Sequence, residues 1–187
     1  GHEIGSHSNS HQLIYRYDRD FFKKDLEISI DSLENITGKK VKAYRAPGFS
    51  LINRTLWAFE ELALQGIEFD CSIFLGNHSH GGRIKTFGQK PSIINFEGVQ
   101  IKEFPINTFK FGYKEIAFAG GGYFRFLPYQ LIKRLMYKNE YIMTYFHPRD
   151  FDSDQPIIQD LSYYRKFKSY YGLNGAFIKA EKFVNDF

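Results

Sequence analysis

The sequence has a single cysteine, Cys71, among 187 residues, and no run of about eighteen apolar residues. One thiol excludes an intrachain disulfide and a zinc cluster built on cysteine. The chain opens without a charged segment followed by an apolar one, so neither a membrane span nor an export signal is predicted. These features favour a reducing compartment such as the cytoplasm. The periplasm or cell envelope stays open, because exported bacterial proteins often lack disulfides as well.

Dense basic runs, internal repeats and linkers rich in Pro or Ser are also lacking. A net charge of +4 spread along the chain does not favour a nucleic-acid partner. With 187 residues, we expect one domain over 1–187, with nothing to indicate its oligomeric state. Aromatic residues make up 18% of the chain, which excludes a disordered protein. Tyrosines suit stacking on sugar rings, although an AT-rich genome also enriches Phe and Tyr.

Strand-like and helix-like segments alternate, which indicates an α/β fold. Helical periodicity and stop signals predict helices over residues 20–37, 53–65, 127–139 and 174–187. Apolar runs predict strands over residues 41–46, 67–70, 99–104 and 142–146. Residues 74–98 show no period and are predicted as a long irregular loop, and residues 119–125 as a tight glycine turn.

Polar side chains follow three of the predicted strands. Arg45, Asp70 and His147 each stand at a strand's carboxyl end, where side chains from separate strands converge in barrel folds. A histidine oriented by a carboxylate can act as a general acid, and a guanidinium can hold a second carboxylate ionised. The alternatives are a turn cap for Asp70, a surface ion pair for Arg45 and a core histidine for His147.

Two histidines four residues apart, His7 and His11, fall on one face if this segment is a helical turn. Neutral imidazoles are common ligands of zinc. The spacing alone fits two hydrogen-bonded or exposed histidines equally well. His2 has no ligand spacing to this pair, and His78 and His80 are interpreted as loop histidines without a metal.

Four motifs occur in order along the chain: His7-Ser8-Asn9-Ser10-His11, Arg45-Ala46-Pro47, Asp70-Cys71-Ser72 and Tyr145-Phe146-His147-Pro148. This order resembles the NodB-homology polysaccharide deacetylases, also called carbohydrate esterase family four. The stretches 69–74, 120–125 and 147–152 look like the branch associated with exopolysaccharide and O-antigen gene clusters.

The resemblance implies a distorted (β/α)7 barrel in which His7 and His11 bind a divalent metal, most often Zn2+, with Co2+ or Ni2+ as alternatives. It implies His147 as the general acid, Asp70 as the group that orients it, and Arg45 as the tether of a base aspartate. Oxyanion or substrate binding is implied for Gly48, Pro47 and Tyr145. The substrate class would be an N-acetylated carbohydrate, with acetate and a free amine as products.

The family's Thr-Phe-Asp-Asp type motif, which precedes the histidines and supplies the third ligand and the base, is not in this chain. We therefore expect the domain to be N-terminally incomplete, without the first strand, and the chain as given to be impaired. A non-catalytic carbohydrate-binding protein with the same fold is the main alternative. A nucleic-acid binder has only the mild positive charge in its favour.

Overall fold

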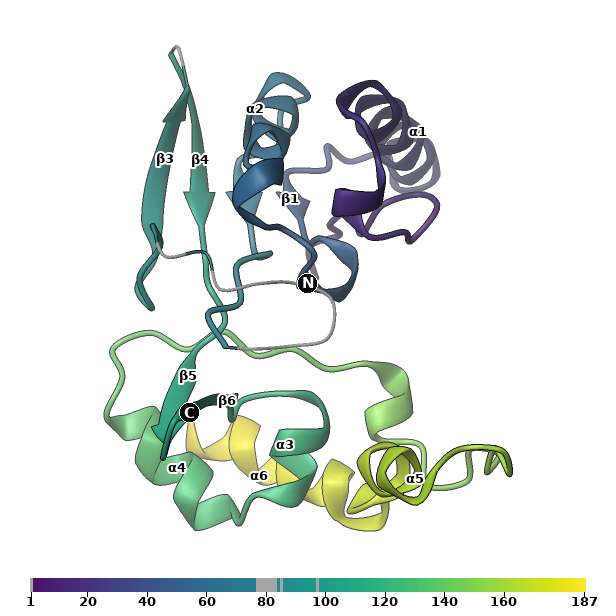
Figure 1. The fold of residues 1–187 in the computed structure, drawn as a ribbon, viewed down its shortest axis with the longest axis vertical. Helices are drawn as coiled ribbons and strands as arrows, with labels where there is room; N and C mark the ends of the chain where they lie inside the picture. Colours follow the sequence, from purple (N-terminus) through teal and green to yellow (C-terminus); the bar gives the residue numbers. More distant parts are fainter. Residues whose placement is uncertain (1, 77–83, 85, 97) are drawn as a thin grey trace. The chain divides into compact units, whose positions relative to one another are not determined.

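The computed structural model describes residues 2–76, 84, 86–96 and 98–187 (Figure 1). The chain divides into two compact units, Gly1–Ile106 and Asn107–Phe187, and each is described by itself. That residues 1–187 act as one domain stays a prediction. Across the described ranges, no helix is long and apolar enough to cross a membrane.

Unit 1 is a mixed α/β arrangement. Its helices are α1 (Arg19–Thr37) and α2 (Trp57–Leu64), and its strands are β1 (Ala43–Tyr44), β2 (Phe69–Asp70), β3 (Ser92–Phe96) and β4 (Val99–Glu103). The strand order is β1-β2-β4-β3, in which β1–β2 and β2–β4 are parallel and β3–β4 is antiparallel. A parallel bridge from Ser6 to Tyr44 sets the chain before α1 against β1.

Helix α1 forms where its sequence predicts it. The Asp18 side chain accepts a 2.8 Å hydrogen bond from the Phe21 N–H and caps the first turn. Gly38 ends the helix in the left-handed conformation at φ 66°, where a side chain would be strained. The apolar face, with Phe22 and Leu26 almost fully buried, packs into the core of unit 1. The helix predicted over 20–37 is therefore confirmed.

The other elements of unit 1 differ in detail. The predicted strands 41–46 and 67–70 shorten to the two-residue β1 and β2, and the helix predicted from Asn53 starts with a short 3-10 turn before α2. The irregular loop predicted over 74–98 is wrong in part, because 92–96 form the edge strand β3. Ile93 is 58% exposed there, so the segment lacks the regular buried periodicity that indicates a strand.

Unit 2 contains a hairpin of β5 (Thr108–Phe111) and β6 (Lys114–Ala117), followed by helices α3 (Gly121–Phe126), α4 (Tyr129–Tyr137), α5 (Tyr163–Tyr170) and α6 (Ala176–Asp186). The glycine turn expected over 119–125 is largely helix α3. The strand expected over 142–146 is reduced to one bridge between Gly120 and Tyr145. Helices α4 and α6 lie within the predicted ranges 127–139 and 174–187.

The described strands thus form a four-stranded sheet in unit 1 and a two-stranded hairpin in unit 2. The mixed α/β class is confirmed. A closed (β/α)7 barrel and an absent first strand stay predictions.

Candidate functional site

His7 and His11 lie beside one another, with ring centroids 4.9 Å apart and ring planes at 75°. The predicted helical turn is wrong: residues 7–11 form an irregular loop in which Ser8 and His11 have positive φ angles of 70° and 52°. The His11 N–H donates to the Ser8 hydroxyl at 2.9 Å and closes this loop. A tight turn, and not a helix, therefore brings the two imidazoles together.

The His7 ring is oriented from the end of β1. Its Nδ1 lies 2.6 Å from the backbone carbonyl oxygen of Arg45. Since a carbonyl oxygen only accepts, Nδ1 carries the proton and the lone pair is on Nε2. Metal-binding histidines commonly donate one ring N–H to a carbonyl or carboxylate oxygen, which fixes the orientation of the ring.

Helix α1 supports the same loop from the other side. The Asp25 carboxylate accepts hydrogen bonds from the N–H groups of Asn9 at 3.0 Å and Ser10 at 2.9 Å. The hydroxyls of Ser6 and Ser29 are 2.8 Å apart. Burial acts to raise the pKa of Asp25, but hydrogen bonds from the Ser10 and Ser8 side chains and from the two amides outweigh it and lower the pKa. Sequence analysis missed Asp25, whose only signal is a charge on the apolar face of a helix.

Arg45, Pro47 and Gly48 follow β1 in one tight turn. Arg45 is half-buried, and its Nε donates to the Cys71 carbonyl at 3.2 Å. Pro47–Phe49 is a 3-10 turn in which Gly48 has a φ of 60°, a conformation that favours glycine. The Ala46 N–H donates to the Ser72 hydroxyl at 2.8 Å, which joins this turn to the end of β2.

Asp70 is fully buried at the end of β2. One carboxylate oxygen accepts the Ser72 N–H at 2.8 Å and the other accepts the Ser72 hydroxyl at 2.7 Å. Glu103, also fully buried, is its register partner on β4. Sequence analysis missed Glu103, which is next to last in the strand predicted over 99–104 and ends the observed β4.

Asp70 and Glu103 are register partners on β2 and β4, and their two buried carboxyl groups influence each other's pKa. Burial, the charge of Asp70 and its side-chain hydrogen bonding raise the pKa of Glu103 well above its ordinary value. Burial also raises the pKa of Asp70, although the side chains of Glu103 and Ser72 and the charge of Arg45 act to lower it. Both carboxyl groups therefore hold a proton up to a higher pH than an exposed carboxyl group does.

His147 and Tyr145 belong to unit 2. The His147 side chain is 62% exposed, with Nδ1 at 3.5 Å from the Asp150 carboxylate. The His147 N–H donates to the same carboxylate oxygen at 3.0 Å. Tyr145 is fixed at its backbone, where its N–H donates to Ala119 and its carbonyl accepts from Gly121. Within unit 2, Asp150 is thus the carboxylate beside His147, and the contact expected between Asp70 and His147 stays a prediction.

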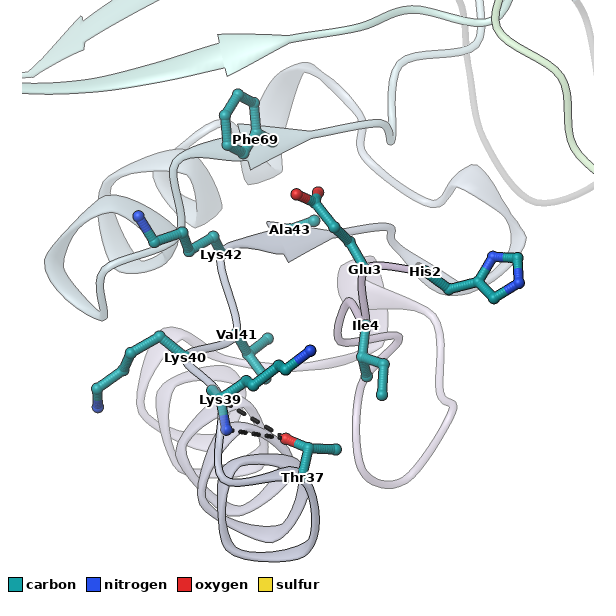
Figure 2. Close-up of a pocket in the computed structure, with 10 residues that line it drawn as sticks. All are labelled: His2, Glu3, Ile4, Thr37, Lys39, Lys40, Val41, Lys42, Ala43 and Phe69. Atoms are coloured by element: carbon teal, nitrogen blue, oxygen red, sulfur yellow. Dashed lines mark hydrogen bonds between the residues drawn. The ribbon is translucent and has the colours of Figure 1, made fainter.

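A separate pocket of about 440 Å³ lies at the amino ends of the strands of unit 1 (Figure 2). His2, Lys39, Lys42 and Phe69 are among its lining residues. The pocket is therefore at the opposite strand ends from His7, Arg45 and Asp70, and His2 does not join the histidine pair. His78 and His80 lie outside the described residues. Where the structure describes the chain, no group of three His, Cys, Asp or Glu side chains could hold a metal ion.

Sequence comparisons divide the chain between residues 67 and 71, which is within unit 1 and not at its boundary after Ile106. Residues 1–67 match the sequence model of the polysaccharide deacetylase family, and residues 71–187 match that of a domain of unknown function, DUF3473. No curated protein matched the chain.

A solved structure described as a polysaccharide deacetylase from Mycobacterium smegmatis is 23% identical, with a TM-score of 0.46. The match covers 57% of this chain and 32% of that one, so the chain spans about a third of the length of that structure. The family assignment rests on the sequence matches. The chain belongs to the DUF3473 family, whose sequence model covers residues 71–187, and its residues 1–67 match the polysaccharide deacetylase family.

Proposed function

We propose that this protein is a metal-dependent hydrolase that removes N-acetyl groups from an N-acetylated polysaccharide or glycan precursor, on a distorted (β/α)7 barrel. The observation that carries the proposal is the histidine pair, with ring centroids 4.9 Å apart and the His7 tautomer set by the Arg45 carbonyl. The match of residues 1–67 to the polysaccharide deacetylase family supports the substrate class.

The donor set fits a divalent ion in part. Two neutral imidazoles, one with its lone pair on Nε2, are suitable zinc ligands, whereas catalytic zinc normally has three protein ligands. His7 and His11 would hold the ion, with Zn2+ favoured and Co2+ or Ni2+ as alternatives. When bound, such an ion polarises the acetyl carbonyl and lowers the pKa of a water molecule. Another side chain or a water molecule would complete the coordination of the ion.

The other side chains take roles around this centre. The water molecule would give a proton to the base aspartate that the resemblance implies, its oxygen would bond to the acetyl carbon, the C–N bond would break, and His147 would donate a proton to the leaving sugar nitrogen. The Gly48 N–H, presented by the turn after Pro47, would stabilise the oxyanion. We assign Asp70 to orienting His147, Arg45 to holding the implied base aspartate, and Tyr145 to substrate binding. Cytoplasmic location is part of the proposal, with the cell envelope as the alternative.

Acetate release tests this function. Purified protein is incubated with chitooligosaccharides and zinc, cobalt or nickel, and acetate is measured enzymatically. We expect slow release, in line with the impairment expected from the sequence, that a chelator abolishes and that His147→Ala lowers by roughly 10²–10⁴-fold, the usual contribution of a general acid. Tyr163→Phe, a change on the exposed start of α5, is the matched control and should leave the rate unchanged.

Two outcomes would contradict the proposal. Acetate release that is insensitive to both chelator and His147→Ala would exclude this mechanism. Tight binding of the oligosaccharide with no acetate under any of the three metals would favour a non-catalytic carbohydrate-binding protein.

A further inference from the structure

Helix α1 presents two polar side chains on its buried face. Asp25 and Ser29 are four residues apart, so they share one side of the helix, and their exposed fractions are 5% and 6%. The neighbouring positions on that face are the core residues Phe22, Leu26 and Ile30. Polar groups in such a place need hydrogen-bond partners, since an unpaired buried carboxylate is strongly destabilising.

The partners of both side chains come from the segment that carries the histidines. Asp25 accepts from the N–H groups of Asn9 and Ser10, which lie between His7 and His11, one bond to each carboxylate oxygen. Ser29 pairs with Ser6, whose hydroxyl also accepts the Ser8 N–H at 3.3 Å. The helix therefore holds the loop immediately before and between the two imidazoles.

The loop has a conformation that needs such support. Ser8 and His11 both have positive φ, a backbone conformation that is strained for a residue with a Cβ atom. A strained turn of this kind persists only where its surroundings determine it. Two charge-assisted hydrogen bonds to one carboxylate from successive amides supply that constraint on the helix side. The Arg45 carbonyl supplies it for the His7 ring.

We propose that Asp25 is the positioning residue of the metal site: it sets the distance between the His7 and His11 imidazoles before any metal binds. The inference rests on the proposed function, because it assumes that these histidines are the ligands. It adds a residue of α1, remote from the four sequence motifs, to the groups that determine metal affinity.

Zinc affinity of the full chain tests the proposal. Isothermal titration with ZnCl2 compares wild type with Asp25→Asn, which keeps the size of the side chain but replaces one acceptor oxygen with a donor. We expect affinity to fall by roughly tenfold to a hundredfold, the usual effect of losing a group that supports a ligand. Asp31→Asn, on the exposed side of the same helix, is the control and should change nothing. Far-UV circular dichroism confirms that all variants are folded.

Amide hydrogen exchange without metal is the second measurement. Asn9 and Ser10 should exchange faster in Asp25→Asn than in wild type, while amides in the middle of α1 keep their protection. Unchanged zinc affinity together with unchanged exchange at these two amides would overturn the role of Asp25.

The two proposals fail in different ways. Zinc binding that His7→Ala and His11→Ala leave intact would refute the proposed metal site, whatever Asp25 does. Zinc binding that both histidine variants abolish, but that Asp25→Asn leaves unchanged, would refute only the positioning role.

Discussion

Three of the buried carboxyl groups in unit 1 have shifted pKa values: that of Asp25 is lowered, and those of Asp70 and Glu103 are raised. Asp25 receives amide and hydroxyl donors, which lower its pKa despite burial. Asp70 and Glu103 are fully buried next to each other, and burial raises the pKa of both. Asp25 therefore contributes stability that is present above the unfolded pKa of Asp, about 3.9, and is lost as the pH falls. The raised pKa values of Asp70 and Glu103 have the opposite effect: their contribution to stability is present at low pH and is lost as the pH rises.

The raised pKa of Glu103 predicts that the stability of the protein depends on pH. A raised folded-state pKa means that the native state binds the proton more tightly than the unfolded chain does. The free energy of unfolding should then fall as the pH rises above about 4.3, the unfolded pKa of Glu. Glu103→Gln keeps a hydrogen-bond donor toward Asp70 but does not titrate, so its stability should fall less over the same range.

Urea unfolding of wild type and Glu103→Gln between about pH 4.5 and pH 8 measures this difference. Glu68→Gln, an exposed residue at the start of the same strand pair, serves as the control for removing one surface carboxylate. Parallel profiles for wild type and Glu103→Gln would show that Glu103 is not protonated in the folded protein at neutral pH.

The start of helix α3 depends on a close contact that only glycine permits. At the start of α3, Gly120 is bridged to Tyr145, and a Cβ atom at Gly120 would overlap the carbonyl oxygen and the ring of Tyr145. The φ of Gly120 is −178°, which any residue adopts, so the requirement for glycine is one of space. This contact joins α3 to the segment that leads to His147.

Gly120→Ala should therefore destabilise unit 2 by at least about 1–3 kcal/mol, the usual cost of overpacking. Gly175→Ala, where no atom lies within 4 Å of the added Cβ and φ is −102°, should have little effect. Thermal unfolding by circular dichroism compares the two variants with wild type. Equal midpoints for both would mean that the Tyr145 segment can move aside.

Elements with local signals were predicted well, and those without them were not. Asp18 and Gly38 mark the ends of α1 because a cap and a left-handed glycine act within the helix itself. Strand β3 owes its formation to five paired residues on β4, and its own apolar residues follow no clear period. The hairpin β5–β6 and helix α5 were likewise not predicted, and α5 has no buried residue to reveal a face.

At the scale of the molecule, the residues assigned to the proposed function are divided between the two units. Both histidines, Asp25 and Asp70 lie in Gly1–Ile106, whereas His147 and Tyr145 lie in Asn107–Phe187. Each unit has its own core of buried hydrophobic residues. Metal binding should therefore be a property of unit 1, and hydrolysis a property of the whole chain.

A fragment of residues 1–106 tests this division. It should bind zinc with the affinity of the full chain, because the two histidines and their supports from α1 and β1 are all present. It should release no acetate, because the general acid is missing. Titration with zinc and the acetate assay measure the two properties. A fragment that is folded by circular dichroism but has lost zinc affinity would show that unit 2 supplies a ligand.

The sequence by itself determined the α/β class, the boundaries of α1 and the order of the motifs that contain His7, Arg45, Asp70 and His147. These properties depend on residues that are close together in the sequence and on the spacing of apolar residues, and both can be read from the chain itself. Only the tertiary structure decided what surrounds them: the Asp25 carboxylate beneath the turn that joins the two imidazoles, and the Glu103 carboxyl group beside Asp70. Ser10 and Asp25 are 15 residues apart, and only the packing of α1 brings them within hydrogen-bond distance, just as only the pairing of β2 with β4 makes Asp70 and Glu103 neighbours.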